Sequence, residues 1–231
     1  MDPRFQPISW LQKKKFQAYL VGNQARNNLL GVKYDPKDID IATSALPDQI
    51  ITILRDQGII PGVVDDQFGV VTFQWQGNEY EVTTFRKDIY DTQFNHIRRT
   101  PSSIEFIDDV KQDAQRRDLT INAIYWDPAS EQYLDPVSGK KDLKDGVIRF
   151  VGDPEIRIKE DPIRVLRAVR FKFSLGFKYD PKTRKALKEL GHMVHKISAP
   201  SLKKEYQKIQ NLPNYHLARK ELRLFGVLPR L

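Results

Sequence analysis

The sequence predicts an α+β fold in which strands and helices are mixed in the first part of the chain and helices dominate the second. In the first part, short runs that alternate apolar and polar residues lie between segments of helical spacing. From about Asp153 onward the strand patterns disappear, and Ile163, Leu166, Val169 and Phe173 recur at helical spacing. Turn-rich segments at residues 136–139 and 144–146 precede this change. We therefore expect a first domain at residues 1–147 and a helical second domain at residues 148–231.

Local patterns predict the individual elements of the first part. Residues 10–16 and 47–57 have helical spacing, whereas residues 18–22 and 39–42 read as short apolar strands. Residues 70–75 and 80–85 alternate as strands do, and the intervening Gln76, Gly77 and Asn78 predict a hairpin turn. Two further helices are predicted to begin near Gln24 and within residues 116–118.

The composition favours a globular protein with an acidic polymer as its partner. A hydrophobic content of 40% in 231 residues is enough for a core. The net charge of +8 suits nucleic acid, because contacts between basic side chains and phosphates provide most nonspecific affinity. The absence of cysteine excludes disulfides, thiolate metal sites and a cysteine nucleophile. The sequence shows neither a signal peptide nor a membrane-spanning segment, so we expect a cytoplasmic location without membrane contact.

Two carboxylates in the run Asp38-Ile39-Asp40 form a candidate metal site. On a strand, residues two positions apart point to the same face, so Asp38 and Asp40 could share one hard cation. Mg²⁺ prefers oxygen ligands and often takes one or two protein carboxylates together with phosphate oxygens. A solvated pair at a strand edge is the alternative, because so short a pattern is common.

The residues around this pair favour phosphoryl transfer. The strand at residues 18–22 ends at Gly22 and Asn23, which tolerate unusual backbone angles, and a helix carrying Arg26 follows. Strand-to-helix turns of this kind bind phosphate through their amides. Glu81 lies on another alternating strand and could supply a third carboxylate. Three acids beside an amide-rich turn are typical of a phosphoryl-transfer site.

Several motifs in order give the sequence a family resemblance. LVGNQARNNLLG, KDIDIAT, FGVVTF, EVTTFRKD, RRDLTINAIYWDP and the stretch from LDPVSGKKDL to EDPIRVLRAVRF cover residues 18–177 approximately. This sequence resembles the class II tRNA nucleotidyltransferases, which are the CCA-adding enzymes, and the related bacterial poly(A) polymerases. The resemblance implies a polymerase-β-like nucleotidyltransferase head with a mixed sheet, followed by an all-α neck and a partial body.

The implied activity is Mg²⁺-dependent addition of C, C and A to the 3′ end of tRNA, from CTP and ATP and without a nucleic-acid template. Asp38 and Asp40 would bind the metal, with Glu81 as the third catalytic acid. CC-only, A-only or poly(A) addition is the alternative within the family. A catalytically weakened nucleotide- or RNA-binding protein is the alternative from another class, although retention of all three acids argues against it.

EDPIRVLRAVRF places Asp161, Arg164, Arg167 and Arg170 at intervals of three, so on a helix they line one edge. A solvated face of ion pairs is the ordinary explanation. The resemblance implies that Asp161 and Arg164 form hydrogen bonds with the base of CTP or ATP, while Arg167 and Arg170 face phosphate or ribose. A carboxylate accepts from an exocyclic amine and a guanidinium donates to ring acceptors, so the pair can select C and A.

RRDLTIN is the third informative motif. Asp118 could simply cap the amides of a helix that begins there. By resemblance, Arg117 and Asp118 bind the nucleotide and its ribose, with Asn122 on the same side. The polar segment at residues 88–101 reads as a surface loop, and by resemblance it corresponds to the flexible loop that favours full CCA synthesis.

The chain departs from the family pattern in sequence and in length. Three stretches differ, namely Gly22-Asn23 in place of Gly-Gly, Ala25-Arg26-Asn27 in place of Val-Arg-Asp, and Pro200-Ser201-Leu202 in place of Glu-Arg-Ile. Asn tolerates left-handed backbone angles, so we expect the turn to persist, with nucleotide affinity most affected by the change. The family continues into a body and tail that grip tRNA. We therefore expect either that this chain is a compact or fragmentary member of the family, or that a homo-oligomer or a second chain supplies the tRNA-binding surface.

Overall fold

The computed structural model describes residues 2–32, 38–90 and 101–228, which form two compact units. Unit 1 comprises residues 2–32, 38–89, 103–117 and 121–140, and unit 2 comprises residues 90, 101–102, 118–120 and 141–228. Most of the loop predicted at residues 88–101 lies outside the described residues. Within the described ranges, no helix combines the length and apolar character needed to cross a bilayer.

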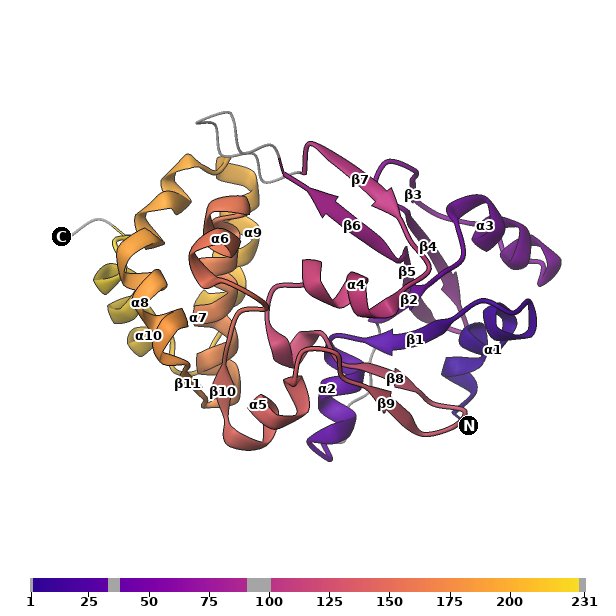
Figure 1. Cartoon of the computed structure of the whole chain (residues 1–231), viewed down its shortest axis with the longest axis horizontal. Coiled ribbons are helices and arrows are strands. Elements are labelled where there is room, and N and C mark those ends of the chain that lie inside the picture. The colour runs from indigo at the N-terminus through magenta and orange to yellow at the C-terminus, as the bar shows by residue number, and fades with distance from the viewer. Residues whose placement is uncertain (1, 33–37, 91–100, 229–231) are drawn as a thin grey trace. The chain divides into compact units, whose positions relative to one another are not determined.

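A mixed seven-stranded sheet organises unit 1, with the strand order β3-β4-β5-β2-β1-β8-β9 (Figure 1). Only β2 and β5 pair in parallel, and the other neighbours pair antiparallel. The strands are β1 (Ala18–Val21), β2 (Asp38–Thr43), β3 (Val64–Asp65), β4 (Val70–Trp75), β5 (Asn78–Thr84), β8 (Tyr125–Asp127) and β9 (Gln132–Leu134). The predicted strands and the hairpin between β4 and β5 are confirmed.

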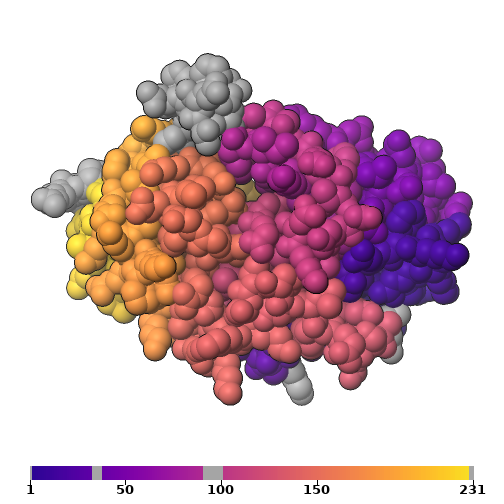
Figure 2. All heavy atoms as spheres, in the orientation of Figure 1, coloured from indigo at the N-terminus to yellow at the C-terminus, as the bar shows by residue number. Residues whose placement is uncertain are grey.

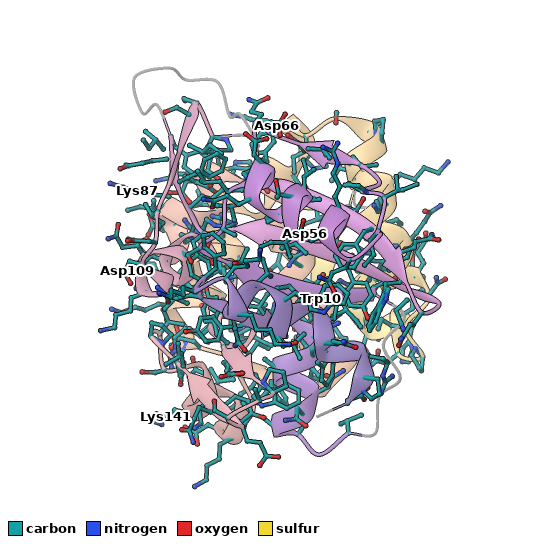
Figure 3. The ribbon with its side chains drawn as sticks, turned by 90° about the vertical axis from the view of Figure 1, so that its right-hand side faces the viewer. Trp10, Asp56, Asp66, Lys87, Asp109 and Lys141 are labelled. Carbon is teal, nitrogen blue, oxygen red and sulfur yellow. The ribbon has the colours of Figure 1, made fainter. Side chains whose placement is uncertain are left out.

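Helices α1 (Gln6–Lys13) and α3 (Pro47–Asp56) pack against one face of this sheet. Their apolar side chains join Leu20, Ile39, Ile41 and other inward-facing strand residues in one core. Figure 3, where Trp10 marks α1 and Asp56 the end of α3, shows both helices in front of the sheet. Because side chains alternate along a strand, the neighbours of the core residues on β2 point to the opposite face.

Other elements of unit 1 flank the sheet. The short helix α2 (Asn23–Leu29) follows β1, as predicted, and α4 (Val110–Arg116) contacts β6. Strands β6 (Arg86–Ile89) and β7 (Ser103–Phe106) form a separate antiparallel pair. All residues of this pair are exposed or half-buried, and their atoms form part of the surface in Figure 2. A 3₁₀ helix, η1 (Pro3–Phe5), leads into α1.

Unit 2 is built mainly from helices. Its helices are α6 (Pro154–Glu160), α7 (Ile163–Leu175), α8 (Pro181–Leu190), η3 (Gly191–Lys196), α9 (Ala199–Gln210) and α10 (Tyr215–Leu224), together with most of α5 (Gly139–Asp145), whose first two residues are assigned to unit 1. On α7, Ile163, Leu166 and Val169 are buried and Phe173 is half-buried, so three of the four residues of the expected apolar stripe lie in the core. Among the described residues beyond 153, a strand occurs where helix was expected, at β11 (Lys178–Tyr179), which pairs in parallel with β10 (Val147–Ile148).

Two helix predictions are wrong at motif residues. The segment at 116–118 does not begin a helix, because α4 ends at Arg116 and Arg117 is extended. Instead, backbone bonds join Thr120 to Arg149 and Val151 to Asp118, and only a 3₁₀ turn, η2 (Thr120–Asn122), follows. Asp161 also lies outside a helix, between α6 and α7, with φ −143°. Pro162 explains this, since a residue before proline is driven out of the helical region.

Gly191 lies at a close contact inside unit 2, and replacing it should destabilise the protein. A Cβ atom at this position would meet the backbone of Phe225 and lie 2.8 Å from its Cβ. Overpacking of this kind costs about 1 to 3 kcal/mol. We expect Gly191→Ala to lower the free energy of unfolding by that amount in urea denaturation. The exposed substitution Lys182→Ala is the control, expected to change it by less than about 0.5 kcal/mol, and equal stabilities would contradict the contact.

Candidate active site

The acids predicted to be catalytic lie on one face of two neighbouring strands. In the parallel pairing of β2 with β5, Asp40 is opposite Glu81, and Asp38 is opposite Glu79. Ile39 and its equivalents point into the core, so these acids point away from it. Asp38 and Glu81 are exposed and Asp40 is half-buried. The strand register thus brings the predicted catalytic acids onto a shared, accessible surface.

A divalent cation bound to these acids would need further ligands, such as phosphate oxygens of a substrate. Across the described ranges, no three Asp, Glu or His side chains lie close enough together to hold an ion by themselves. Asp38, Asp40 and Glu81 are therefore not grouped as three ligands of one ion. Two carboxylates with phosphate oxygens satisfy Mg²⁺, and Asp38 and Asp40 suit that mode because they share a face.

Gly22 lies directly beside Asp40. It joins β1 to α2 with φ 68° and ψ −121°, a conformation that residues with a Cβ rarely adopt. A Cβ at Gly22 would lie 3.3 Å from Oδ2 of Asp40. The missing side chain therefore lets the turn approach this carboxylate closely.

The predicted phosphate-turn residues are joined by hydrogen bonds. The buried guanidinium of Arg26 donates from Nη2 to Oδ1 of Asn23 at 2.7 Å and from Nη1 to Oδ1 of Asn122 at 2.5 Å. Asn23 at the second turn position therefore supplies an acceptor that glycine could not provide. Gln24, which the sequence did not single out, donates from Nε2 to the backbone oxygen of Asp38. The Gln24 bond ties the start of α2 to the strand that carries the acids, and the Arg26 bonds tie α2 to η2.

Arg117 is held by two residues that the sequence motifs did not indicate as part of the site, Asp113 and Tyr125. Its Nε and Nη2 donate to Oδ2 of Asp113, and Nε also donates to the hydroxyl of Tyr125. Burial by itself would raise the pKa of Asp113, but Arg117 and Arg116 outweigh it and lower this pKa to about 2. Burial also raises the pKa of Tyr125. The only sequence signal was the spacing of Asp113 three and four positions before the two arginines.

In unit 2, Asp118 pairs with Arg167. Nε of Arg167 donates to Oδ2 of Asp118 at 2.6 Å, and Oδ1 accepts from the amide of Leu119. Asp118 therefore does not cap a following helix as its motif suggested, because its side chain bonds the adjacent amide and an arginine of α7. The attraction of Asp118 raises the pKa of Arg167. Asp118 and Arg167, both predicted to bind nucleotide, are thus brought together.

Arg164 and Asp161 of unit 2 also make hydrogen bonds with neighbouring residues. Nη1 of Arg164 donates to Oε2 of Glu160 at 2.7 Å and to the carbonyl of Arg157 at 3.0 Å. Oδ1 of Asp161 accepts from the amide of Ile163 at 3.1 Å. Asp161 therefore occupies the entry of α7, with Arg164 one turn further on.

Arg170, the last arginine of the row, contacts a different element. Its Nε donates to Oε1 of Glu205 on α9 at 2.5 Å. The structure therefore gives Arg164, Arg167 and Arg170 different carboxylate partners, Glu160, Asp118 and Glu205.

Comparison with known protein families assigns the chain to one of them. The model of the poly(A) polymerase head domain matches residues 18–149, which is more than half of the chain. The chain belongs to the poly(A) polymerase head-domain family. The expected family resemblance is confirmed, as is the α+β fold.

Relatives of this poly(A) polymerase head-domain protein include both CCA-adding and poly(A)-adding enzymes. It is 39% identical to the CCA-adding enzyme of Ligilactobacillus salivarius over 199 residues, 86% of this chain and 46% of that one. It is 36% identical to poly(A) polymerase I of Escherichia coli over 226 residues, 90% of this chain and 47% of that one. The crystal structure of the Bacillus stearothermophilus CCA-adding enzyme with CTP superposes with a TM-score of 0.84 at 33% identity, covering 98% of this chain and 53% of that one. The chain thus spans about half the length of these relatives.

Replacing Gly22 in this head domain should impair nucleotide use. Gly22→Ala combines a disfavoured backbone angle with a side chain against the Asp40 carboxylate. The strain costs about 1 to 3 kcal/mol, and its relief would displace the turn. We expect affinity for CTP to fall about tenfold or more, measured by isothermal titration calorimetry. Gly77→Ala, at the β4–β5 turn with φ 77° and open space, is the matched control; equal CTP affinity for both variants would contradict a role for the turn.

Proposed function

We propose that this protein is a CCA-adding tRNA nucleotidyltransferase, which transfers C, C and A from CTP and ATP to tRNA 3′ ends without a nucleic-acid template. The observation that carries the proposal is the parallel register that places Glu81 opposite Asp40, with Gly22 against Asp40. Similarity to CCA-adding enzymes along most of the chain supports the substrate assignment.

Asp38 and Asp40 would hold Mg²⁺, because their hard oxygen donors on one face of β2 fit this ion. When bound there, the ion would supply positive charge that offsets the charge of the triphosphate and favours ionisation of a hydroxyl beside it. Glu81 would help to activate the terminal 3′-hydroxyl of tRNA for in-line attack on the α-phosphate. Pyrophosphate then leaves. Most of the rate enhancement in such reactions comes from positioning and charge stabilisation rather than from covalent catalysis.

The turn at Gly22 and Asn23 would bind phosphate, with Arg26 held by Asn23 and Asn122 as its cation. Arg117 would contact the nucleotide from its anchored position beside Asp113. Asn122, which accepts from Arg26, belongs to the same hydrogen-bonded group.

Unit 2 would supply nucleotide selection. Asp161 and Arg164 would read the base edge, because a carboxylate accepts from the amine of C or A while a guanidinium donates to ring acceptors. Asp118 would bind the ribose hydroxyls, which both donate and accept. Arg167, paired with Asp118, and Arg170 would lie near ribose or phosphate.

The proposed macromolecular partner is the 3′ end of tRNA. The net charge of +8 favours binding to a polyanion, with an affinity that falls as salt rises. We propose that the protein acts in the cytoplasm, where it would bind tRNA as a homo-oligomer or with a second chain.

The test uses tRNA that ends before CCA, incubated with Mg²⁺ and with CTP, ATP, GTP or UTP singly, or with CTP and ATP together. We expect two added residues with CTP alone, and three added residues with CTP and ATP together. The control variant is Asp66→Asn, which replaces an exposed carboxylate labelled in Figure 3, and it should extend tRNA normally.

The products separate the alternatives. An extended ladder with ATP alone would favour a poly(A) polymerase, and growth that stops after CC in the mixture would favour CC-only addition. Addition of a single A, and only to tRNA already ending in CC, would favour an A-adding enzyme. CTP binding without extension would favour a catalytically weakened binding protein.

A further inference from the structure

Asp113 is fully buried in unit 1 and has no part in the proposed chemistry, yet both of its oxygens are occupied. Oδ1 accepts from Nε of Arg116 at 2.7 Å and from the backbone amide of Arg86 at 3.2 Å. Oδ2 accepts from Nε and Nη2 of Arg117 at 3.2 and 3.0 Å, and from the Tyr125 hydroxyl at 2.6 Å. A buried carboxylate with five donors is a built feature, because an unpartnered buried charge is very costly.

The contacts of Arg117 fix its guanidinium from two sides. Nε donates to the Tyr125 hydroxyl at 2.8 Å, and the guanidinium carbon lies 5.0 Å from the centre of the Tyr125 ring. The Tyr125 hydroxyl therefore accepts from Arg117 while it donates to Asp113. Arginine has many rotamers in water, and ordering them when a ligand binds reduces affinity. A guanidinium already held by Asp113 and Tyr125 avoids most of that loss.

We propose that Asp113, assisted by Tyr125, is a positioning residue that holds Arg117 in the orientation needed to bind the incoming nucleotide. This inference rests on the proposed nucleotide contact of Arg117. It assigns to Asp113 an effect on nucleotide affinity rather than on the chemical step. The carboxylate stays ionised across the physiological range, so its hold on Arg117 does not depend on pH there.

The test is a double-mutant cycle on CTP affinity, measured by isothermal titration calorimetry with the full chain and Mg²⁺. Asp113→Asn keeps the shape of the side chain but removes its charge and turns acceptor positions into donors. We expect the Kd for CTP to rise about tenfold, the size expected for ordering one long side chain. Arg117→Ala should raise the Kd at least as much. The double variant should bind no more weakly than Arg117→Ala alone, because residues acting through one contact are not additive.

Asp142→Asn is the matched control. Asp142 is also buried, and it accepts from Thr120 and from Arg149, but it has no role in the proposed site. In thermal unfolding, Asp142→Asn should lose about as much stability as Asp113→Asn does, while its affinity for CTP stays unchanged. Steady-state extension assays should show a raised KM for CTP with nearly unchanged kcat for Asp113→Asn. Tyr125→Phe is a milder change, and it remains informative if Asp113→Asn does not fold. It should raise the Kd for CTP about threefold. In the Arg117→Ala background, the same substitution should leave the Kd unchanged.

Several results would overturn the inference. Wild-type CTP affinity in both Asp113→Asn and Tyr125→Phe would do so, and so would additive losses in the cycle. In either case, weaker binding by Arg117→Ala would leave the proposed function intact. If Arg117→Ala bound CTP as the wild type does, the assignment of Arg117 itself would fail together with the inference. Absence of CTP binding by the wild type would instead refute the proposed function.

Discussion

Asp38→Asn and Asp40→Asn should each lower kcat for CMP addition to tRNA by about 10³-fold or more. Both acids point away from the core, from the same strand, so each substitution removes a metal-binding oxygen while leaving the packing of β2 unchanged. Loss of the charge stabilisation that the metal supplies should raise the activation free energy by several kcal/mol, and each 1.36 kcal/mol lowers the rate tenfold. Single-turnover extension of tRNA at saturating CTP measures the effect directly.

The control for these variants lies at the far edge of the same sheet. Asp66→Asn changes an exposed carboxylate near β3 and should retain wild-type kcat. Thermal unfolding of all three variants should be close to that of the wild type, because the substituted side chains are exposed or half-buried. Activity within threefold of wild type in both Asp38→Asn and Asp40→Asn would remove the chemical basis of the proposed function.

Asp161→Asn should weaken the choice of CTP over UTP by about 10- to 100-fold. The wild-type carboxylate can only accept, whereas asparagine also donates and can pair with the carbonyl of U. The expected change corresponds to about 1 to 3 kcal/mol for a mismatched polar group. Asparagine can still accept from the amide of Ile163, so the entry of α7 should be retained. Ratios of kcat/KM for CTP and UTP on the same tRNA measure the effect.

Arg164→Gln should also weaken base selection, with a loss of kcat/KM for CTP and ATP. Arg164 is held by Glu160 and by the carbonyl of Arg157, so its guanidinium has a defined position. Arg184→Gln on the exposed surface of α8 changes charge equally and serves as the control. A CTP preference as strong as that of the wild type in both Asp161→Asn and Arg164→Gln would show that the base is selected elsewhere.

The strands of the head were predictable because their patterns are local. The alternation in β4 and β5 and the turn at Gly77 specify a hairpin without any distant contact. Asp38 and Asp40 were correctly expected on one face, since period two follows from strand geometry. The position of Glu81 opposite Asp40 depends on the parallel pairing of β2 with β5, which local spacing cannot predict.

The parts that were not predicted depend on contacts distant in sequence. The segment around Asp118 looked like a capped helix start, but its backbone bonds to residues 149–151 and its carboxylate bonds Arg167. The arginine row of α7 looked like a single edge, although its carboxylate partners come from three different segments. Asp113 was missed because only the fold reveals that it is buried with Tyr125.

The most direct test of the central claim is a crystal structure of the protein grown with Mn²⁺ and a non-hydrolysable CTP analogue. Mn²⁺ prefers the same oxygen ligands as Mg²⁺ and gives an anomalous signal that locates it. The account predicts an anomalous peak in direct coordination with Asp38, Asp40 and phosphate oxygens of the nucleotide. A bound triphosphate whose metal lies away from both aspartates would contradict it.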